Sequence, residues 1–242
     1  MSRARVLLLH GSVANGEATW AAQRPLGERF ELCVPNRRGF PPGPDVEAVD
    51  FEEEAVWLEQ FLEAGTHLVG HSYGGVICLL AAARVPRLLG SLTVVEPPAF
   101  AVARGNPAAD AFVAGAERLW RSGPREPEAF LREFLRAVGG APPRGRPTEG
   151  LLQGARTLMV ERYPWTAEIP LEALAAAPFP KLVVSGAHSE AFEAVCDVLE
   201  RRLGAERAVL PGAGHSVQRL GAPFNELLTA FLERAAAGRP RG

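Results

Sequence analysis

A serine stands at the centre of a glycine-bounded motif whose spacing suits nucleophilic catalysis. Residues 70–74 read GHSYG, with Ser72 in the middle, after an apolar run and before an apolar helical segment. A Gly-x-Ser-x-Gly turn between a strand and a helix presents the serine hydroxyl from a strained backbone. The glycines are needed because strand and helix approach with no room for Cβ atoms. We therefore predict Ser72 as a nucleophile and the amide of Tyr73, at the helix start, as an oxyanion donor.

A histidine near the end of the chain is placed to serve as a general base. Residues 209–216 read VLPGAGHS, a short apolar run followed by a glycine-rich loop that carries His215. A base that must reach a serine on another element is well placed on such a loop. The chain order, serine first and histidine last, fits the strand–turn–helix arrangement in which Ser72 lies. His215 is the predicted base.

The first apolar run offers a second oxyanion donor. Residues 6–12 read VLLLHGS, a strand that ends at His10 and Gly11 and passes into a loop. Where a serine lies on a strand-to-helix turn, one oxyanion N–H comes from the residue after it and the other from the loop after an earlier strand. By position, this second donor is the amide of Ser12.

Six short apolar runs, bounded by glycine or proline, must position these groups. They are residues 5–9, 31–34, 67–69, 92–95, 182–185 and 208–210. Such runs are typical of strands buried on both faces, and hence of a parallel sheet. Helical patterns lie between them: one begins at Asp50, an N-cap followed by Glu53, and others cover residues 74–85, 191–203 and 224–236. The alternation predicts an α/β fold with a doubly wound, mostly parallel six-stranded sheet.

One stretch interrupts the alternation. Residues 98–180 contain no strand pattern; helical patterns cover residues 109–121, 127–138 and 151–163, and a loop covers 139–150. An inserted helical cap over the carboxyl edge of the sheet explains this arrangement. We predict a core made of residues 1–97 and 180–242 and a cap made of residues 98–179. Three aromatic residues are expected to line a pocket beneath the cap: Trp120, Tyr163 and Trp165.

These pieces together resemble the α/β-hydrolase superfamily, notably its small, capped, bacterial esterase-like members. The matching residues are His10 and Gly11, Trp20, residues 36–40 (NRRGF), residues 70–75 and residues 212–215. The predicted core is covered well, and the predicted cap matches only in kind. The family usually begins with two further strands, so the resemblance implies six strands in the order 2-1-3-4-5-6. It also implies a Ser–His–acid triad built on Ser72 and His215.

The acid of the triad is where this chain departs from the family. Most members carry a Gly-x-x-Asp pattern after the next-to-last strand, but here Gly186 is followed by Ser189 at the aspartate position. A serine cannot stabilise an imidazolium as a carboxylate does. Three alternatives remain: Glu96, after the strand that some family members use for their acid; Glu190, one residue displaced; or no acid. We favour Glu96, because a carboxylate directly at a buried strand end is otherwise costly to desolvate.

Charge and composition limit the partners of the chain. Its 242 residues carry a formal net charge of −2, which gives no general attraction to nucleic acid or to anionic membranes. No apolar stretch is long enough for a membrane helix. Cys33, Cys78 and Cys196 are expected to be buried, reduced thiols, which favours a cytoplasmic location. A small-molecule substrate is therefore expected, and the oligomeric state is not readable from the sequence.

The remaining polar residues receive no catalytic role. We expect no cofactor and no metal, because the chain lacks zinc-binding, Walker and Rossmann motifs. His71 is expected to pack away from Ser72, and His188 has no assigned role. The pairs at 37–38 and 201–202 are expected to be solvated arginines.

The combined expectation is a hydrolase that cleaves an ester-like bond of a small, apolar substrate through an acyl-enzyme. The fold hosts other reactions with the same serine and histidine, so three alternatives stay open: a carbon–carbon hydrolase, a cofactor-free haloperoxidase-like enzyme and a hydroxynitrile lyase. A fourth is a degenerate, non-catalytic protein that captures a small ligand beneath the cap.

Overall fold

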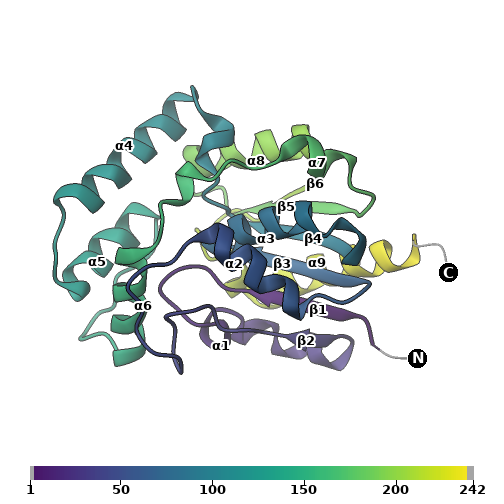
Figure 1. Ribbon diagram of the computed structural model, residues 1–242, viewed down its shortest axis with the longest axis horizontal. Helices are drawn as coiled ribbons and strands as arrows, with labels where there is room; N and C mark the ends of the chain where they lie inside the picture. The colour runs from purple at the N-terminus through teal and green to yellow at the C-terminus, as the bar shows by residue number, and fades with distance from the viewer. Residues whose placement is uncertain (1–2, 239–242) are drawn as a thin grey trace.

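The protein is built on a parallel, six-stranded open sheet with helices on both faces (Figure 1). The computed structural model describes residues 3–238. The strands are β1 (Arg5–Leu9), β2 (Glu31–Cys33), β3 (Thr66–His71), β4 (Leu89–Val95), β5 (Lys181–Ser185) and β6 (Glu206–Val209), in the order β2-β1-β3-β4-β5-β6. The predicted fold class, strand number and strand order are confirmed.

Burial differs between the central and the edge strands. Every residue of β3, β4 and β5 is buried, as predicted for strands covered on both faces. The edge strands β2 and β6 are only partly buried, so the prediction was wrong for them, because an edge strand has a sheet neighbour on one side only. Cys33 lies on β2 and is half-buried, so the expected burial is wrong for this cysteine and correct for Cys78 and Cys196.

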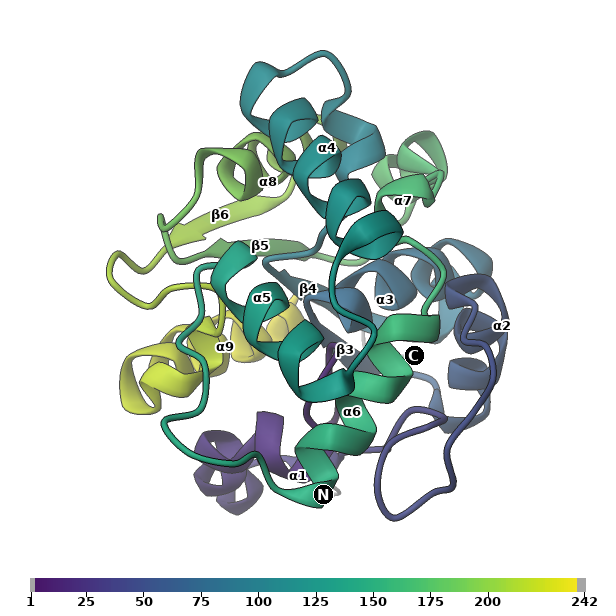
Figure 2. The ribbon, with the colours of Figure 1, turned by 90° about the vertical axis from the view of Figure 1, so that its left-hand side faces the viewer.

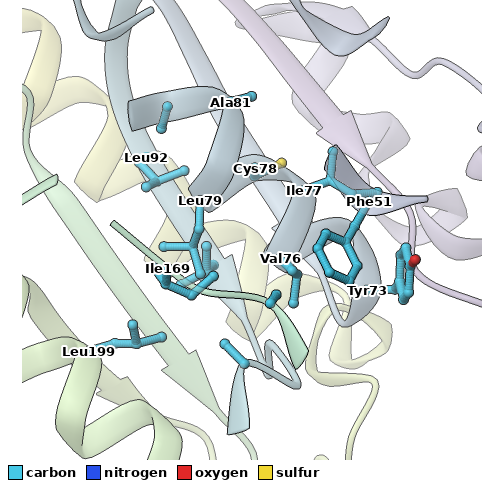
Figure 3. Packing of buried hydrophobic residues seen from close by; sticks show 14 of the residues in the cluster. Phe51, Tyr73, Val76, Ile77, Cys78, Leu79, Ala81, Leu92, Ile169 and Leu199 are labelled. Atoms are coloured by element: carbon cyan, nitrogen blue, oxygen red, sulfur yellow. The ribbon is translucent and has the colours of Figure 1, made fainter. Parts of the chain in front are cut away.

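Side chains of successive strand residues alternate between the two faces. On one face, α2 (Phe51–Leu58), α3 (Tyr73–Arg84) and α8 (Glu190–Leu203) form the larger core cluster with residues such as Leu7 and Leu9 of β1. Figure 3 shows α3 residues, among them Val76 and Leu79, packed within this cluster. On the other face, α9 (Ala222–Ala237) packs on the alternate residues of β1.

Four helices lie in the stretch predicted to be an insertion, and residues 98–179 carry no strand of the sheet. They are α4 (Pro107–Ser122), α5 (Pro127–Ala137), α6 (Glu149–Val160) and α7 (Leu171–Ala176). Figure 2 shows α4, α5 and α6 in front of the sheet, on the side where β3 and β4 end. The helical expectation holds. The division into a core and a separate cap stays a prediction, and residues 1–2 and 239–242 of that core lie outside the described residues.

Local sequence explains where the helices begin and end. The Asp50 side chain accepts a hydrogen bond from the amide of Glu52, and it is the N-cap of α2 as predicted. The predicted helix at 151–163 ends earlier, at Val160, because Glu161 leaves the helix to pair with Val49 in an isolated parallel bridge. In residues 3–238 no helix is long and apolar enough to cross a membrane.

Candidate active site

Ser72 lies in a strained turn between β3 and α3. Its φ of 54° and ψ of −127° lie outside the regions that non-glycine residues favour. The turn is held by the Ser72 amide, which donates to the carbonyl of Val95 at 2.9 Å. A Cβ on Gly70 would lie 2.5 Å from the carbonyl oxygen of Gly74, and one on Gly74 would lie 2.3 Å from that of His10. The predicted need for both glycines is explained by this close approach.

His215 meets the serine hydroxyl at hydrogen-bond distance. Its Nε2 lies 2.9 Å from Ser72 Oγ, and both residues are buried. The loop that carries His215 is shaped by Gly212 and Gly214, whose φ angles are 82° and 66°. An imidazole nitrogen at this distance can accept the hydroxyl proton.

His71 supports the position of His215. Its Nε2 donates a hydrogen bond of 3.0 Å to the His215 carbonyl oxygen. Burial, and then the charge of the neighbouring His215, lower the pKa of His71 to about 3, so this ring is neutral at neutral pH. The expectation that His71 packs away from the site was therefore incomplete, since a side chain next to Ser72 holds the loop of the histidine.

Glu96 reaches the other side of the His215 ring. It is fully buried directly after β4, and its Oε2 lies 3.5 Å from His215 Nδ1. The second oxygen, Oε1, accepts a hydrogen bond of 2.7 Å from the amide of Gly186. Burial by itself would raise the pKa of Glu96, but interactions with His188 and His215 outweigh it and lower the pKa to about 2. A carboxylate at Nδ1 leaves the Nδ1 proton on His215 and makes Nε2 the acceptor.

The other acid candidate lies elsewhere. Glu190 is exposed as the first residue of α8, and Ser189 before it is the N-cap. Of the two glutamates weighed from the sequence, the structure brings Glu96 next to His215 and leaves Glu190 in solvent.

The two expected oxyanion donors have no hydrogen-bond acceptor among the described residues. Within residues 3–238 no backbone or side-chain acceptor takes the amide N–H of Ser12 or of Tyr73. Gly11 brings the Ser12 loop against the serine turn, since a Cβ on Gly11 would lie 2.7 Å from Ser72 Cβ. Both N–H groups therefore remain free to donate to a ligand oxygen.

Arg37 was expected in solvent, and this prediction was wrong. Its guanidinium is fully buried and contacts two buried carboxylates, with 2.7 Å from Nη2 to Glu54 Oε2 and 2.7 Å from Nη2 to Glu161 Oε1. It also donates from Nη1 to the Gly11 carbonyl at 3.0 Å. Glu161 accepts in turn from the Ser12 hydroxyl. Arg38, by contrast, is exposed as expected, and so are the arginines at 201 and 202.

Sequence reasoning missed most of this network for a physical reason. Arg37 belongs to the NRRGF segment that carried the family resemblance, and this was the one available signal for it. Glu161 follows a helix of the insertion and carries no motif. Its partners become visible only once α6 and the first two strands are placed together.

His188 was the second residue missed. It lies in the loop after β5, and its Nδ1 is 3.5 Å from Glu96 Oε2. Glu96 is thus shared by two imidazoles, His188 and His215. Among residues 3–238, these three side chains form the one group of metal-ligating atoms close enough together to hold an ion.

Two cavities meet at Ser72. The larger, of about 450 Å³, is lined on one side by the His215 loop and on the other by α5, including Leu131 and Leu135. The smaller, of about 40 Å³, is walled by aromatic side chains, among them Phe100, Phe112, Trp120, Trp165 and Phe192. The expectation of aromatic walls holds for Trp120 and Trp165. Tyr163 stacks on Trp165 from outside and is 40% exposed.

The sequence and the fold were compared with known proteins. The profile of the Alpha/beta hydrolase family matches residues 6–227. No curated protein sequence matches the chain. A thermophilic esterase from Thermogutta terrifontis is a structural neighbour, with 21% identity, a TM-score of 0.64 and coverage of 97% of this chain and 91% of the esterase.

Two further structures share the fold. A hydrolase from Oleispira antarctica has 18% identity and a TM-score of 0.72, with coverage of 96% of this chain and 92% of the other. An N-acyl homoserine lactonase crystallised with N-hexanoyl homoserine has 22% identity and a TM-score of 0.70, with coverage of 99% and 92%. At these identities the neighbours establish the fold alone, and the family assignment rests on the sequence profile. The chain belongs to the alpha/beta hydrolase family.

Proposed function

We propose that this hydrolase is a serine esterase in which Ser72 is the nucleophile, His215 the general base and Glu96 the triad acid. The observation that carries the proposal is that the His215 ring contacts both other residues. Its Nε2 lies 2.9 Å from Ser72 Oγ, and its Nδ1 lies 3.5 Å from Glu96 Oε2. The second contact is long for a hydrogen bond, but triad contacts commonly tighten when substrate binds.

The reaction follows from these positions. Ser72 Oγ attacks the ester carbonyl carbon while His215 Nε2 takes the hydroxyl proton, and the carbonyl electron pair moves onto oxygen. The amides of Ser12 and Tyr73 hold that oxyanion. When the carbon–oxygen bond to the alcohol breaks, His215 returns the proton to the leaving oxygen.

Water completes the cycle. It attacks the acyl-serine as His215 takes one of its protons, and the acid leaves as Ser72 regains its hydrogen. In both halves Glu96 accepts the Nδ1 proton of His215 in a hydrogen bond and stabilises the imidazolium by its charge. The low pKa of Glu96 keeps it ionised throughout the neutral range.

The two cavities support a substrate with a short acyl group. The leaving oxygen must lie beside His215, and the larger cavity is lined by residues on both sides of that histidine. This cavity suits the alcohol portion. The smaller aromatic cavity, on the Tyr73 side, is left for the acyl group, and about 40 Å³ admits only a few carbon atoms. Esters of acetate or propionate with a larger alcohol are the proposed substrate class.

The deciding experiment is labelling with a fluorophosphonate probe, followed by mass spectrometry of the peptides. The probe reacts with activated serines and needs little knowledge of the substrate. We expect one adduct, on Ser72, that is absent in His215→Ala. The buried Ser91 is an internal control and should stay unlabelled. A folded protein that takes no label would instead indicate a ligand-binding protein without catalysis.

A further inference from the structure

We propose that Glu96, His188 and His215 form a zinc site, and that a bound zinc ion inhibits the enzyme by occupying its base. The three donor atoms all lie within 4.8 Å of one another. They come from three separate loops, after β4, after β5 and after β6, which the parallel sheet brings together at its carboxyl edge.

The distances between the donors suit a zinc ion. Glu96 Oε2 is 3.5 Å from His188 Nδ1 and 3.5 Å from His215 Nδ1. Ligands about 2.0–2.2 Å from a tetrahedral zinc lie roughly 3.3–3.6 Å from each other. The two imidazole nitrogens lie within 4.8 Å of each other, and a rotation of the His188 side chain would bring this third pair to the same separation.

The hydrogen bonds of Glu96 and His188 leave atoms of both side chains available to bind an ion. Glu96 uses Oε1 for the Gly186 amide, so Oε2 is available. Neither ring nitrogen of His188 makes a hydrogen bond to any of residues 3–238, although both are buried. His188 Nδ1 has only the contact of 3.5 Å with Glu96 Oε2, and coordination to an ion would give this weakly satisfied imidazole a strong partner. His188 is also the ligand with the most exposure, 12% of its side chain.

The chemistry of the set favours zinc over harder cations. Two imidazoles and one carboxylate are a common protein ligand set for zinc, and a fourth position remains for water. Magnesium and calcium prefer oxygen donors throughout. The ring of Phe192, with its centroid 4.8 Å from that of His215 and 5.5 Å from that of His188, gives the site an apolar wall that strengthens metal–ligand interactions.

Zinc at this position would stop the proposed reaction. A zinc ion on Nδ1 of His215 places the remaining imidazole proton on Nε2, the atom that faces Ser72. That nitrogen can then no longer take the serine proton. The zinc ion also takes Glu96 Oε2 as a ligand, so this carboxylate no longer accepts a hydrogen bond from His215 Nδ1. The inhibition rests on the proposed function, whereas zinc binding itself does not.

Binding is tested without catalysis in the Ser72→Ala chain, titrated with zinc chloride in a calorimeter. We expect one zinc per chain, and affinity weaker by at least about tenfold when His188→Ala or His188→Gln is added. Cys33→Ser is the matched control, because Cys33 is the one half-buried thiol of the described chain and should not alter binding. No zinc binding, or binding unaffected by both His188 variants in folded protein, overturns the proposal. Thermal unfolding of each variant establishes that it is folded.

Inhibition is tested with the unsubstituted chain and a short-acyl ester. We expect zinc to suppress hydrolysis and EDTA to restore it, with much weaker suppression in His188→Ala relative to that variant's own metal-free rate. Zinc that binds but leaves hydrolysis unchanged overturns the inhibitory role. Absence of hydrolysis in metal-free buffer concerns the proposed esterase activity instead, and the calorimetric result stands apart from it.

Discussion

Arg37 and Glu161 are 124 positions apart in the chain, and their side chains meet at 2.7 Å with almost no exposure to solvent. Glu161 follows α6, so this contact joins the helical insertion to the loop after β2. Because Glu161 also accepts from Ser12 and Arg37 donates to Gly11, the ion pair holds one proposed oxyanion donor in place. Stability and the proposed activity are thus linked through this ion pair.

Arg37→Met should destabilise the protein severely. The substitution leaves Glu54 and Glu161 buried without their cation, and breaking a buried pair from one side costs about 3–5 kcal/mol. Arg38→Met is the matched control: its pair with Glu53 is exposed, and the change should stay within about 0.5 kcal/mol. Urea unfolding of both variants measures the difference. A loss below about 1 kcal/mol for Arg37→Met would contradict the importance given to the network.

Two glycines in the helical insertion should respond in opposite ways to alanine. A Cβ on Gly154, in α6, would lie 1.8 Å from the carbonyl oxygen of Val13, next to Ser12, so the loop must move. We expect Gly154→Ala to cost about 1–3 kcal/mol and to lower kcat/KM by at least about tenfold. Gly115→Ala, in α4, meets only the flexible end of Arg118 at 3.6 Å and should stabilise by about 0.4–1 kcal/mol with unchanged activity. Equal behaviour of the two variants in unfolding and ester assays would count against this account.

The sequence was a good guide wherever the chemistry and the local pattern coincide. The position of Ser72 could be predicted because its glycines are needed for a turn of fixed geometry, and that of His215 because its loop follows a strand late in the chain. The central strands were readable because burial on both faces leaves only apolar residues. Each of these features is determined by a short run of neighbouring residues.

The missed residues depend on contacts that no local pattern encodes. Arg37 is charged, and its neighbour Arg38 is solvated, so nothing in the pair distinguishes the buried member from the exposed one. Glu161 and His188 acquire partners only when elements more than ninety residues away are in place, as in the contact of His188 with Glu96. The choice between Glu96 and Glu190 was open for the same reason, since nothing local shows that the carboxylate at the start of α8 lies in solvent.

Acid should destabilise the protein partly through His10. Its Nδ1 donates a hydrogen bond to the carbonyl oxygen of Gly11, and its Nε2 accepts one from the Arg37 amide. Because Nε2 accepts, it carries no proton, and the buried ring is neutral. Burial, and then the charge of Arg37, lower the pKa of His10 from 6.5 to about 3. Below pH 6.5, His10 therefore binds a proton in the unfolded chain but stays neutral in the folded chain. The free energy of unfolding falls as the pH drops towards 3.

Comparison with His10→Asn isolates this contribution. Between pH 7 and pH 5 the unsubstituted chain should lose about 2 kcal/mol more of its unfolding free energy than the variant, because all other titrating groups are common to both. The measurement is urea unfolding at the two pH values. Parallel losses in the two proteins would mean that His10 is protonated in the folded state.

The aromatic cavity should set the length of the acyl group. Phe112 stacks on Phe100 with centroids 4.6 Å apart and lines the smaller cavity. Phe112→Ala enlarges that space, and the ratio of kcat/KM for a hexanoyl ester to that for an acetyl ester should rise by at least about tenfold. Phe61→Ala, a half-buried aromatic that packs on Trp57 away from both cavities, should leave the ratio unchanged. A constant ratio in Phe112→Ala would place the acyl group in the larger cavity.

Replacing Glu96 by glutamine should separate the charge of this residue from its place in the fold. The Glu96→Gln side chain keeps an oxygen for the Gly186 amide but loses the negative charge beside His215 Nδ1. By analogy with other triad acids, kcat should fall by a factor on the order of 10³ to 10⁴. Glu190→Gln removes an exposed carboxylate next to the family's usual acid position and should leave kcat nearly unchanged. The reverse pattern would make Glu190 the acid, through a movement of the loop after β5, while two active variants would show that His215 works without a carboxylate.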